Sequence, residues 1–208
     1  MVSRRLGGAG LVLLVLWLSG CSHAPVRYLK PAPGPVVILG DSLAAGVGAP
    51  EGRGFVGQLE ERLQIEIVNQ GVPGDTTARA LERLEEDVLE LEPSLVIVEL
   101  GGNDFLQKVP PEETFANLEN IIGQIHELET PVLLLGVQAG VFSDKHGERY
   151  EELARRLEVA YVPNILEGIL ASPALKYDGI HPNEEGYRKL ADKIEPVLRR
   201  LLGEMERI

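Results

Sequence analysis

The chain has 208 residues, of which 44% are hydrophobic and 25% charged, a composition typical of a globular protein rather than a disordered or fibrous one. This length suits one domain with a full hydrophobic core. The formal net charge is −12 and the sequence contains no Lys/Arg-rich run, which argues against nucleic acid as a partner.

Residues 1–20 have the order of an export signal. Two arginines precede the apolar run 11–18, which is too short for a comfortable membrane span, and Ser19 and Gly20 then lead to Cys21. The sequence Leu-Ser-Gly-Cys resembles the lipobox of bacterial lipoproteins, in which the cysteine becomes lipidated. The alternative is an ordinary export signal with an incidental cysteine. Since the chain has no other cysteine, we expect a signal peptide at 1–20 and a lipid anchor on Cys21.

A proline-rich segment follows the expected signal. Residues 21–35 contain four prolines, which disfavour regular structure and favour an extended tether. We therefore expect the folded domain to occupy residues 36–208. The lipobox resemblance, with Ser22 rather than aspartate after the cysteine, implies an exported lipoprotein on the periplasmic face of the bacterial outer membrane.

Beyond Pro35, short apolar segments alternate with amphipathic ones. The runs of apolar residues, such as Leu-Val-Ile-Val at 95–98, indicate strands buried on both faces, as in a parallel sheet. The alternation predicts an α/β protein, a three-layer α/β/α sandwich with a mostly parallel five-stranded sheet. Strands are expected at 36–39, 65–69, 95–100, 132–136 and 159–162, and helices at 55–63, 77–91, 111–128, 147–157 and 183–202.

Ser42 follows the first expected strand, in the stretch VVILGDSLAAG at residues 36–46. A serine at this position is either the N-cap of the next helix or a nucleophile. In open α/β sheets the ligand site lies outside the carboxyl ends of the strands. A nucleophilic Ser42 therefore requires partners that follow other strands or lie in a loop over the same edge.

Two further segments follow strand ends. Gly74, in the segment NQGVPGDTT, lets a backbone N–H approach a ligand, although Gly-Asp-Thr is also an ordinary turn and helix cap. Asn103, after two glycines, can aim its amide at a developing oxyanion, although Asn-Asp is also a common turn. Either segment by itself is weak evidence for a site.

Asp178 precedes His181 by three residues, with Gly179 between them. This spacing lets the chain curl so that Asp178 holds one ring nitrogen of His181 and leaves the other free as a base. Together, the segments at the strand ends supply a nucleophile, a base, an orienting carboxylate and oxyanion donors, as in a Ser-His-Asp hydrolase.

These segments resemble the GDSL or SGNH hydrolase superfamily, whose naming motif Gly-Asp-Ser-Leu is residues 40–43. The resemblance runs from about Val36 to near the C-terminus and implies a flavodoxin-like SGNH hydrolase fold. It implies that no metal or cofactor is needed, and the remaining histidines are too scattered to form a ligand set. The implied roles are Ser42 as nucleophile, His181 as base, Asp178 as its orienting acid, and an oxyanion hole formed by the N–H groups of Ser42 and Gly74 and the side-chain amide of Asn103.

Within this superfamily, the stretches ILGDSLAAG, VELGGND and DGIHPN look closest to the bacterial thioesterase, arylesterase and lysophospholipase group. The resemblance implies hydrolysis of small-molecule acyl esters, such as acyl thioesters, aryl esters and lysophospholipids, and we expect a monomer. Alternatives are a carbohydrate O-acetyl esterase acting on envelope polysaccharide and a non-catalytic lipoprotein that binds a lipid or glycan. A nucleotide-binding flavodoxin-like protein is disfavoured, because the dinucleotide glycines and the phosphate-loop lysine are missing.

Two expectations concern the surroundings of the serine. Asp41 is expected to bond the backbone of the serine turn rather than to serve as the triad acid, so that Asp41→Asn should leave activity intact. Apolar residues after the third and fourth strands either line an acyl pocket or form small local cores. These residues are Phe105, Leu106, Val141 and Phe142, the last two in the loop 137–146.

Overall fold

The structure is a computed structural model that describes residues 25–30, 32–138 and 144–207. Within these residues, no helix has both the length and the apolar character needed to cross a membrane. The expected signal peptide and Cys21 lie outside the described residues, as do Val141 and Phe142.

Five strands form one parallel sheet in the order β2-β1-β3-β4-β5. This order is that of flavodoxin-like folds, in which ligands bind at the point between β1 and β3 where the strand order reverses. The predicted parallel sheet is therefore confirmed. The strands are β1 (Val36–Gly40), β2 (Ile67–Gly71), β3 (Leu95–Glu99), β4 (Val132–Leu135) and β5 (Ala160–Val162).

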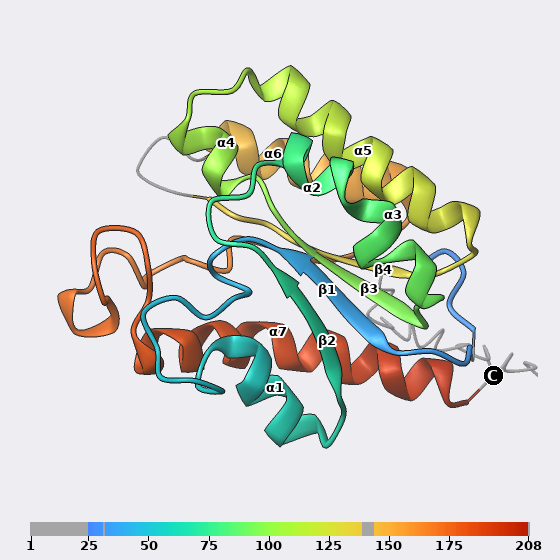
Figure 1. Cartoon of the computed structure of the whole chain (residues 1–208), viewed down its shortest axis with the longest axis horizontal. Helices are drawn as coiled ribbons and strands as arrows, with labels where there is room; N and C mark the ends of the chain where they lie inside the picture. The colour runs from blue at the N-terminus through green and yellow to red at the C-terminus, as the bar shows by residue number, and fades with distance from the viewer. Residues whose placement is uncertain (1–24, 31, 139–143, 208) are drawn as a thin grey trace, which may run out of the picture.

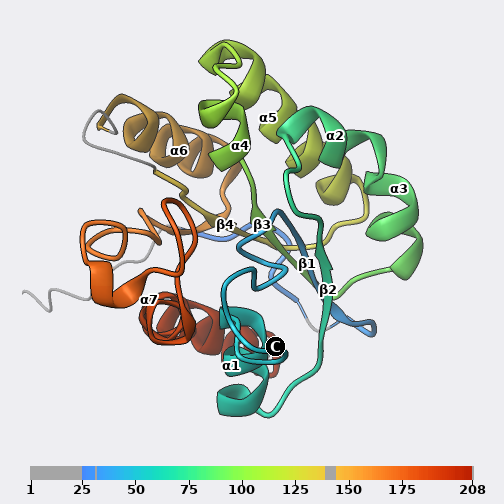
Figure 2. The ribbon, with the colours of Figure 1, turned by 60° about the vertical axis from the view of Figure 1, so that its left-hand side comes forward.

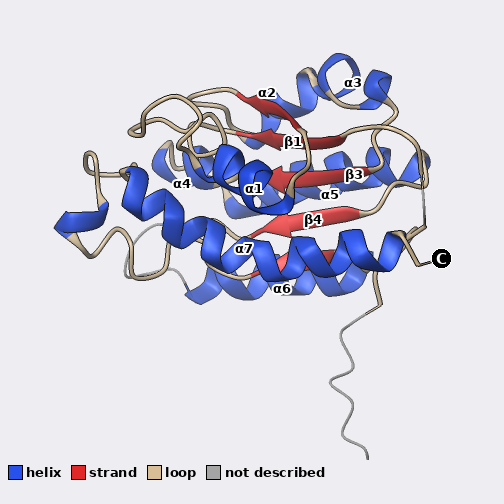
Figure 3. Ribbon diagram, turned by 90° about the horizontal axis from the view of Figure 1, so that it is seen from below, coloured by secondary structure: helices blue, strands red, loops and turns tan. Residues whose placement is uncertain are grey.

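Helices cover both faces of the sheet, as Figures 1 and 2 show. Helices α1 and α7 lie on one face, and α2, α3, α5 and α6 lie on the other. Figure 3 shows α1 and α7 in front of the sheet in the view from below. The helices are α1 (Phe55–Leu63), α2 (Thr77–Glu82), α3 (Leu84–Asp87), α4 (Gly102–Leu106), α5 (Pro111–Glu127), α6 (Asp144–Leu157) and α7 (Glu184–Met205), with 3-10 turns at Leu89–Leu91 and Pro173–Leu175.

The central strands are apolar on both faces because each face packs against helices. In β1, Val36 and Ile38 belong to the core under α1 and α7, whereas Val37 and Leu39 belong to the core on the opposite face. Alternate side chains of a strand point to opposite faces, so a strand between two helical layers needs a continuous apolar run. The edge strand β2 is only partly buried.

Most predicted elements are observed with ends shifted by at most three residues, and two differ in placement or continuity. The strand expected at 65–69 lies at Ile67–Gly71, where its polar residues extend the edge of the sheet beside β1. The single helix expected at 77–91 is broken after Glu82. The break lies at Arg83, whose side chain donates to the carbonyl oxygens of Gly40 and Gln70, a contact with the sheet that helical periodicity does not reveal.

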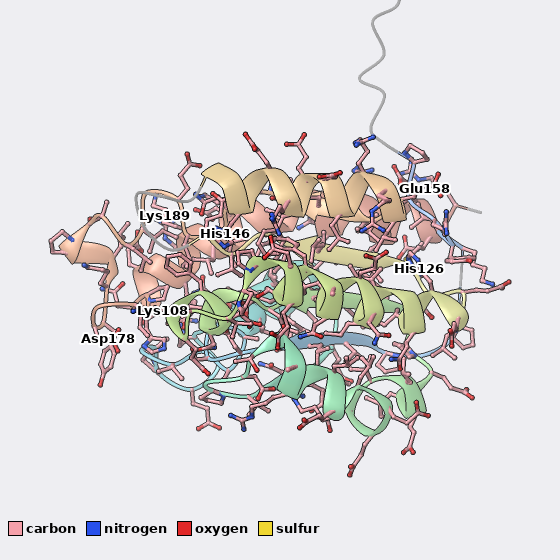
Figure 4. All side chains as sticks on the ribbon, turned by 90° about the horizontal axis from the view of Figure 1, so that it is seen from above. Lys108, His126, His146, Glu158, Asp178 and Lys189 are labelled. Carbon is pink, nitrogen blue, oxygen red and sulfur yellow. The ribbon has the colours of Figure 1, made fainter. Side chains whose placement is uncertain are left out.

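The expected tether contacts the domain in its described part. The N–H of Arg27 donates to the carbonyl of Glu158 at 2.7 Å, and Val26 and Leu29 pack against the core. Glu158 lies two residues before β5, so this segment lies at the amino ends of the strands (Figure 1). In Figure 4, Glu158 lies at the end of the molecule opposite Asp178.

Candidate active site

Ser42 lies in the turn that follows β1 and is 8% exposed. The turn is closed by a hydrogen bond from the Ala45 N–H to the Asp41 carbonyl at 3.0 Å. The next helix, α1, begins at Phe55 with Gly54 at its N-cap, so Ser42 caps no helix there. The helix-cap interpretation of Ser42 is wrong, because a loop of more than one turn separates the strand from the helix.

His181 and Asp178 lie in the loop after β5 and reach Ser42 across the sheet edge. The Nε2 atom of His181 is 3.0 Å from the Ser42 Oγ atom, and its Nδ1 atom is 2.8 Å from Asp178 Oδ2. The other oxygen, Asp178 Oδ1, accepts the N–H groups of Ile180 and His181, each at 2.8 Å. The three-residue spacing therefore forms the local turn that the sequence predicts, and it fixes the ring through one nitrogen.

The environment keeps the Asp178 carboxylate ionised. The hydrogen bond with His181, followed by the N–H groups of Ile180 and His181, lowers the pKa of Asp178 to about 2. Asp178 is 43% exposed and His181 15% exposed, so the acid lies on the solvent side of the histidine. The ionised Asp178 can hold the imidazole with its proton on Nδ1, which leaves Nε2 as the acceptor facing Ser42.

The ends of this loop are fixed by backbone and capping contacts. The Tyr177 N–H donates to the His181 carbonyl at 2.9 Å, which closes a hairpin around Asp178. Asn183 then caps α7, since its side-chain oxygen accepts the Gly186 N–H at 3.0 Å. This cap fixes the start of α7, and His181 lies three residues before the first residue of this long helix, Glu184.

Asn103 lies in α4, directly after β3. Its Nδ2 atom donates to Asp41 Oδ2 and to the Asp75 carbonyl oxygen, each at 2.9 Å. Both amide hydrogens therefore have acceptors in the free protein, and an anion bound there must share or replace one of them. The structure brings Asn103 to the edge that holds Ser42, although it does so in a short helix rather than in the turn considered from the sequence.

Gly74 follows β2 with a φ of +84°, a conformation that L side chains rarely adopt. In the described part of the chain, neither the N–H of Gly74 nor that of Ser42 donates to a backbone carbonyl. Both groups are therefore free to bind an oxyanion, as the sequence interpretation requires. Thr76 caps α2 through its side chain. The segment around Gly74 therefore contains both a free N–H group and the ordinary helix cap considered as the alternative interpretation.

Asp41 bonds the serine turn, as expected, and also makes a contact that the sequence did not predict. Its Oδ1 atom accepts the Leu43 N–H at 2.9 Å, and its Oδ2 atom accepts the amide of Asn103. An asparagine at this position has only one acceptor oxygen and cannot satisfy both donors. The structure therefore changes the expected effect of Asp41→Asn from none to a loss of activity.

Several buried polar residues around the site were missed by the sequence interpretation. Asp104 accepts both the N–H and the hydroxyl of Thr77, at 2.9 and 2.5 Å, and so connects α4 to the start of α2. Asp75 Oδ2 accepts a hydrogen bond from the Arg83 Nε atom at 2.7 Å. The one sequence signal for such a residue is Glu99, an acidic residue at the end of an otherwise apolar buried strand.

Two apolar cavities lie beside the catalytic edge, the edge of the sheet at the carboxyl ends of the strands, where Ser42 and His181 meet. One of about 30 Å³ lies directly over Ser42 and His181, and Leu106, Val137 and Ile180 help to line it. A neighbouring cavity of about 270 Å³ shares Val137 and includes Phe105. Phe105 and Leu106 are 40% and 46% exposed, so they form no buried local core and instead border these cavities.

Within residues 25–30, 32–138 and 144–207, no cluster of three or more His, Cys, Asp or Glu side chains is arranged to hold a metal ion. The chemical groups that converge at the sheet edge are instead a hydroxyl, an imidazole, a carboxylate and several N–H donors. This set is suited to attack on a carbonyl carbon by an activated serine.

Comparison with known proteins gives matches over most of the chain. The family model described as GDSL-like Lipase/Acylhydrolase matches residues 38–189. Esterase TesA of Pseudomonas aeruginosa is 33% identical over 201 residues, which cover 90% of this chain and 98% of that protein. Thioesterase 1/protease 1/lysophospholipase L1 of Escherichia coli (strain K12) is 30% identical and covers 87% of this chain and 94% of its own length.

Solved structures agree with these matches. A crystal structure of TesA aligns with a TM-score of 0.75 at 31% identity and covers 80% of this chain and 99% of its own. AlinE4, an SGNH-hydrolase family esterase, aligns with a TM-score of 0.64 at 33% identity and covers 83% and 99% of the two chains. The protein belongs to the GDSL-like lipase/acylhydrolase family and is a hydrolase that acts on ester bonds.

Proposed function

We propose that the protein hydrolyses carboxylic esters and thioesters of medium acyl chains, lysophospholipids among them, through an acyl-serine intermediate on Ser42. The observation that carries the proposal is the continuous contact from Ser42 Oγ to His181 Nε2, at 3.0 Å, and from His181 Nδ1 to Asp178 Oδ2, at 2.8 Å. These distances lie in the range required of a nucleophile, its base and the group that orients the base.

The proposed reaction has two halves. In the first, His181 takes the proton of the Ser42 hydroxyl as the oxygen attacks the ester carbonyl, and it returns that proton to the departing alcohol or thiol. In the second, His181 takes a proton from water as the water oxygen attacks the acyl-serine, and it then gives that proton to the departing Ser42 Oγ as the carboxylic acid is released. Ionised Asp178 stabilises the imidazolium that forms in each half.

The oxyanion of each tetrahedral intermediate is proposed to bind the free N–H groups of Ser42 and Gly74 together with the amide of Asn103. The first two N–H groups are free of backbone acceptors in the described chain. The Asn103 amide points to the same edge, where the oxyanion would take over or share the hydrogen now donated to Asp75 or Asp41. Donors held in place before the reaction stabilise the developing charge without costly reorganisation.

The apolar cavities support an acyl substrate. The cavity of about 30 Å³ over Ser42 is large enough for only the first carbons of a chain. The adjoining cavity of about 270 Å³ offers space for a longer chain on the other side of Val137. The smaller volume by itself favours an acetyl group, so a carbohydrate O-acetyl esterase remains the second candidate.

A series of p-nitrophenyl esters from acetate to palmitate tests the proposal. We expect the chain from Ser22 onward to turn over medium acyl chains fastest, because both cavities can then be filled, and Ser42→Ala to abolish turnover at every length. Turnover confined to acetate would favour the carbohydrate O-acetyl esterase. No turnover at any length would contradict the proposal and favour a lipoprotein that binds a ligand without hydrolysing it.

We also propose that Cys21 carries a lipid anchor in the periplasmic face of the bacterial outer membrane and that the protein is a monomer. Arg27 lies six positions after Cys21, a span of at most about 20 Å. Arg27 is bound beside Glu158, at the end of the molecule opposite Asp178 (Figure 4). This position supports an orientation in which the catalytic edge faces away from the anchoring membrane.

Fractionation tests the anchor. We expect the full-length protein to sediment with membranes and Cys21→Ala to appear in the soluble fraction with unchanged specific esterase activity, because the anchor is remote from Ser42. Ser22→Ala, next to the cysteine, serves as the matched control and should stay with the membranes. Membrane association of Cys21→Ala would contradict the proposal.

A further inference from the structure

Glu99 is a fully buried carboxyl side chain beneath the serine turn, and the reaction described above does not use it. It is the last residue of β3, after four apolar residues, and is 0% exposed. In the sheet register it lies opposite Gly40, where an added Cβ atom would be 3.0 Å from Glu99 Oε2. The absence of a side chain at Gly40 therefore leaves room for the carboxyl group at the start of the Gly-Asp-Ser-Leu motif.

The contacts of Glu99 satisfy only one of its two oxygens. Its Oε2 atom accepts the N–H of Asp41 at 3.2 Å. Among the described residues, its Oε1 atom has no hydrogen-bond donor. A buried carboxylate normally has both oxygens satisfied by donors, because removing its charge from water is costly. Glu99 is therefore poorly suited to the ionised form.

The neighbouring carboxyl group of Asp41 has the opposite environment. Asp41 is 2% exposed, yet both of its oxygens accept N–H groups, from Leu43 and from Asn103, at 2.9 Å each. Burial raises the pKa of Asp41 to about 6, and these hydrogen bonds favour its ionised form. Of the two carboxyl groups, Asp41 is therefore the one whose negative charge is stabilised by hydrogen-bond donors on both oxygens at neutral pH.

The two carboxyl groups belong to neighbouring segments, since Glu99 Oε2 accepts the backbone N–H of Asp41, and each affects the pKa of the other. Burial, and then the negative charge of Asp41, raise the pKa of Glu99 well above its ordinary range. The side chain of Asp41 raises the pKa of Glu99 and the side chain of Glu99 lowers that of Asp41, which are the directions expected if Glu99 keeps the proton. Two adjacent buried carboxyl groups cannot both ionise cheaply, so one shared proton is the expected state.

We propose that Glu99 is a positioning residue for the oxyanion hole: as a neutral acid it donates a hydrogen bond to the Asp41 carboxylate, which in turn holds the Asn103 amide and the Leu43 N–H in place. The inference rests on the proposed acyl-serine function for its catalytic consequence. Glu99 itself does not contact the substrate. It acts through Asp41, and its effect belongs to the tetrahedral intermediates rather than to substrate binding.

Two substitutions separate a neutral donor from a charged or merely space-filling side chain. Glu99→Gln keeps the shape, one acceptor and an N–H donor for Asp41, so kcat should stay within about threefold of the wild-type value. Glu99→Leu fills the space without a donor, so kcat should fall about tenfold to a hundredfold, with little change in KM. Asp41→Asn, which removes an acceptor for Asn103 or Leu43, should resemble Glu99→Leu.

Thermal melting shows whether each variant is folded, and Glu66→Gln, at an exposed glutamate, is the matched control with unchanged kinetics. If Glu99→Leu fails to fold, the comparison rests on Glu99→Gln and on the spectroscopic measurement below. A Glu99→Gln enzyme with a kcat as low as that of Glu99→Leu, or a Glu99→Leu enzyme with wild-type kcat, would overturn the proposal.

Infrared spectroscopy tests the proton without reference to activity. The wild-type protein at neutral pH should show the carbonyl stretch of a protonated carboxyl group, and Glu99→Gln should lack it. Absence of this band from the wild type, or its persistence in Glu99→Gln, would overturn the inference. If the wild type has the band but hydrolyses no ester, the proposed function fails while the shared proton stands.

Discussion

Replacement of His181 by alanine is expected to remove almost all turnover, with kcat falling by roughly 10⁴-fold to 10⁶-fold, as for other Ser-His-Asp hydrolases. His181 contacts Ser42 Oγ at 3.0 Å and is the only imidazole among the described residues that contacts it. Without the imidazole, the hydroxyl of Ser42 keeps its proton and is a poor nucleophile. Single-turnover and steady-state hydrolysis of the preferred p-nitrophenyl ester measure the effect.

A double variant makes this expectation sharper. Because Ser42 and His181 act as one unit, Ser42→Ala/His181→Ala should be no slower than either single variant. His126→Ala is the matched control, since Figure 4 shows His126 at the end of the molecule opposite Asp178, and its kcat should be unchanged. Multiplicative losses in the double variant, or substantial turnover by His181→Ala, would contradict the assigned pairing.

Replacement of Asn103 by alanine is expected to lower kcat by roughly 10²-fold to 10³-fold with a small change in KM, the usual effect of losing one oxyanion donor. The amide of Asn103 lies at the catalytic edge, and its two hydrogens are donated to Asp41 and Asp75 in the free protein. The negative charge of a tetrahedral intermediate is a stronger acceptor than the Asp75 carbonyl, so the donor becomes most valuable in the transition state.

The same substitution removes two internal hydrogen bonds, so stability must be measured alongside activity. Thermal melting identifies any loss of folded protein, and a phosphonate ester that reacts with Ser42 counts intact nucleophiles. Asn120→Ala, on the exposed side of α5, is the control with unchanged kinetics. A folded Asn103→Ala enzyme with near-normal kcat would remove Asn103 from the oxyanion hole and leave it a structural link between Asp41 and Asp75.

The sequence was sufficient where local pattern and chemistry coincide. Continuous apolar runs predicted β1, β3 and β4 as buried strands, since a strand between two helical layers has to be apolar on both faces. The spacing of Asp178 and His181 predicted their contact, because a three-residue turn determines it without help from the rest of the fold. The family motif at residues 40–43 predicted Ser42 as the nucleophile, and the proposed function rests on that prediction.

Only the tertiary structure determined the contacts between segments that are distant along the chain. The helix predicted at 77–91 is broken at Arg83, whose side chain contacts the carbonyl oxygens of Gly40 and Gln70. The link from Asp41 to Asn103 depends on β1 and β3 being neighbours. The periodicity of apolar residues in the sequence predicts which face of a helix or strand is buried, but it does not predict which polar groups a side chain contacts there. Such contacts are determined by sheet register and helix placement, and they are what turn a recognisable motif into an arranged site.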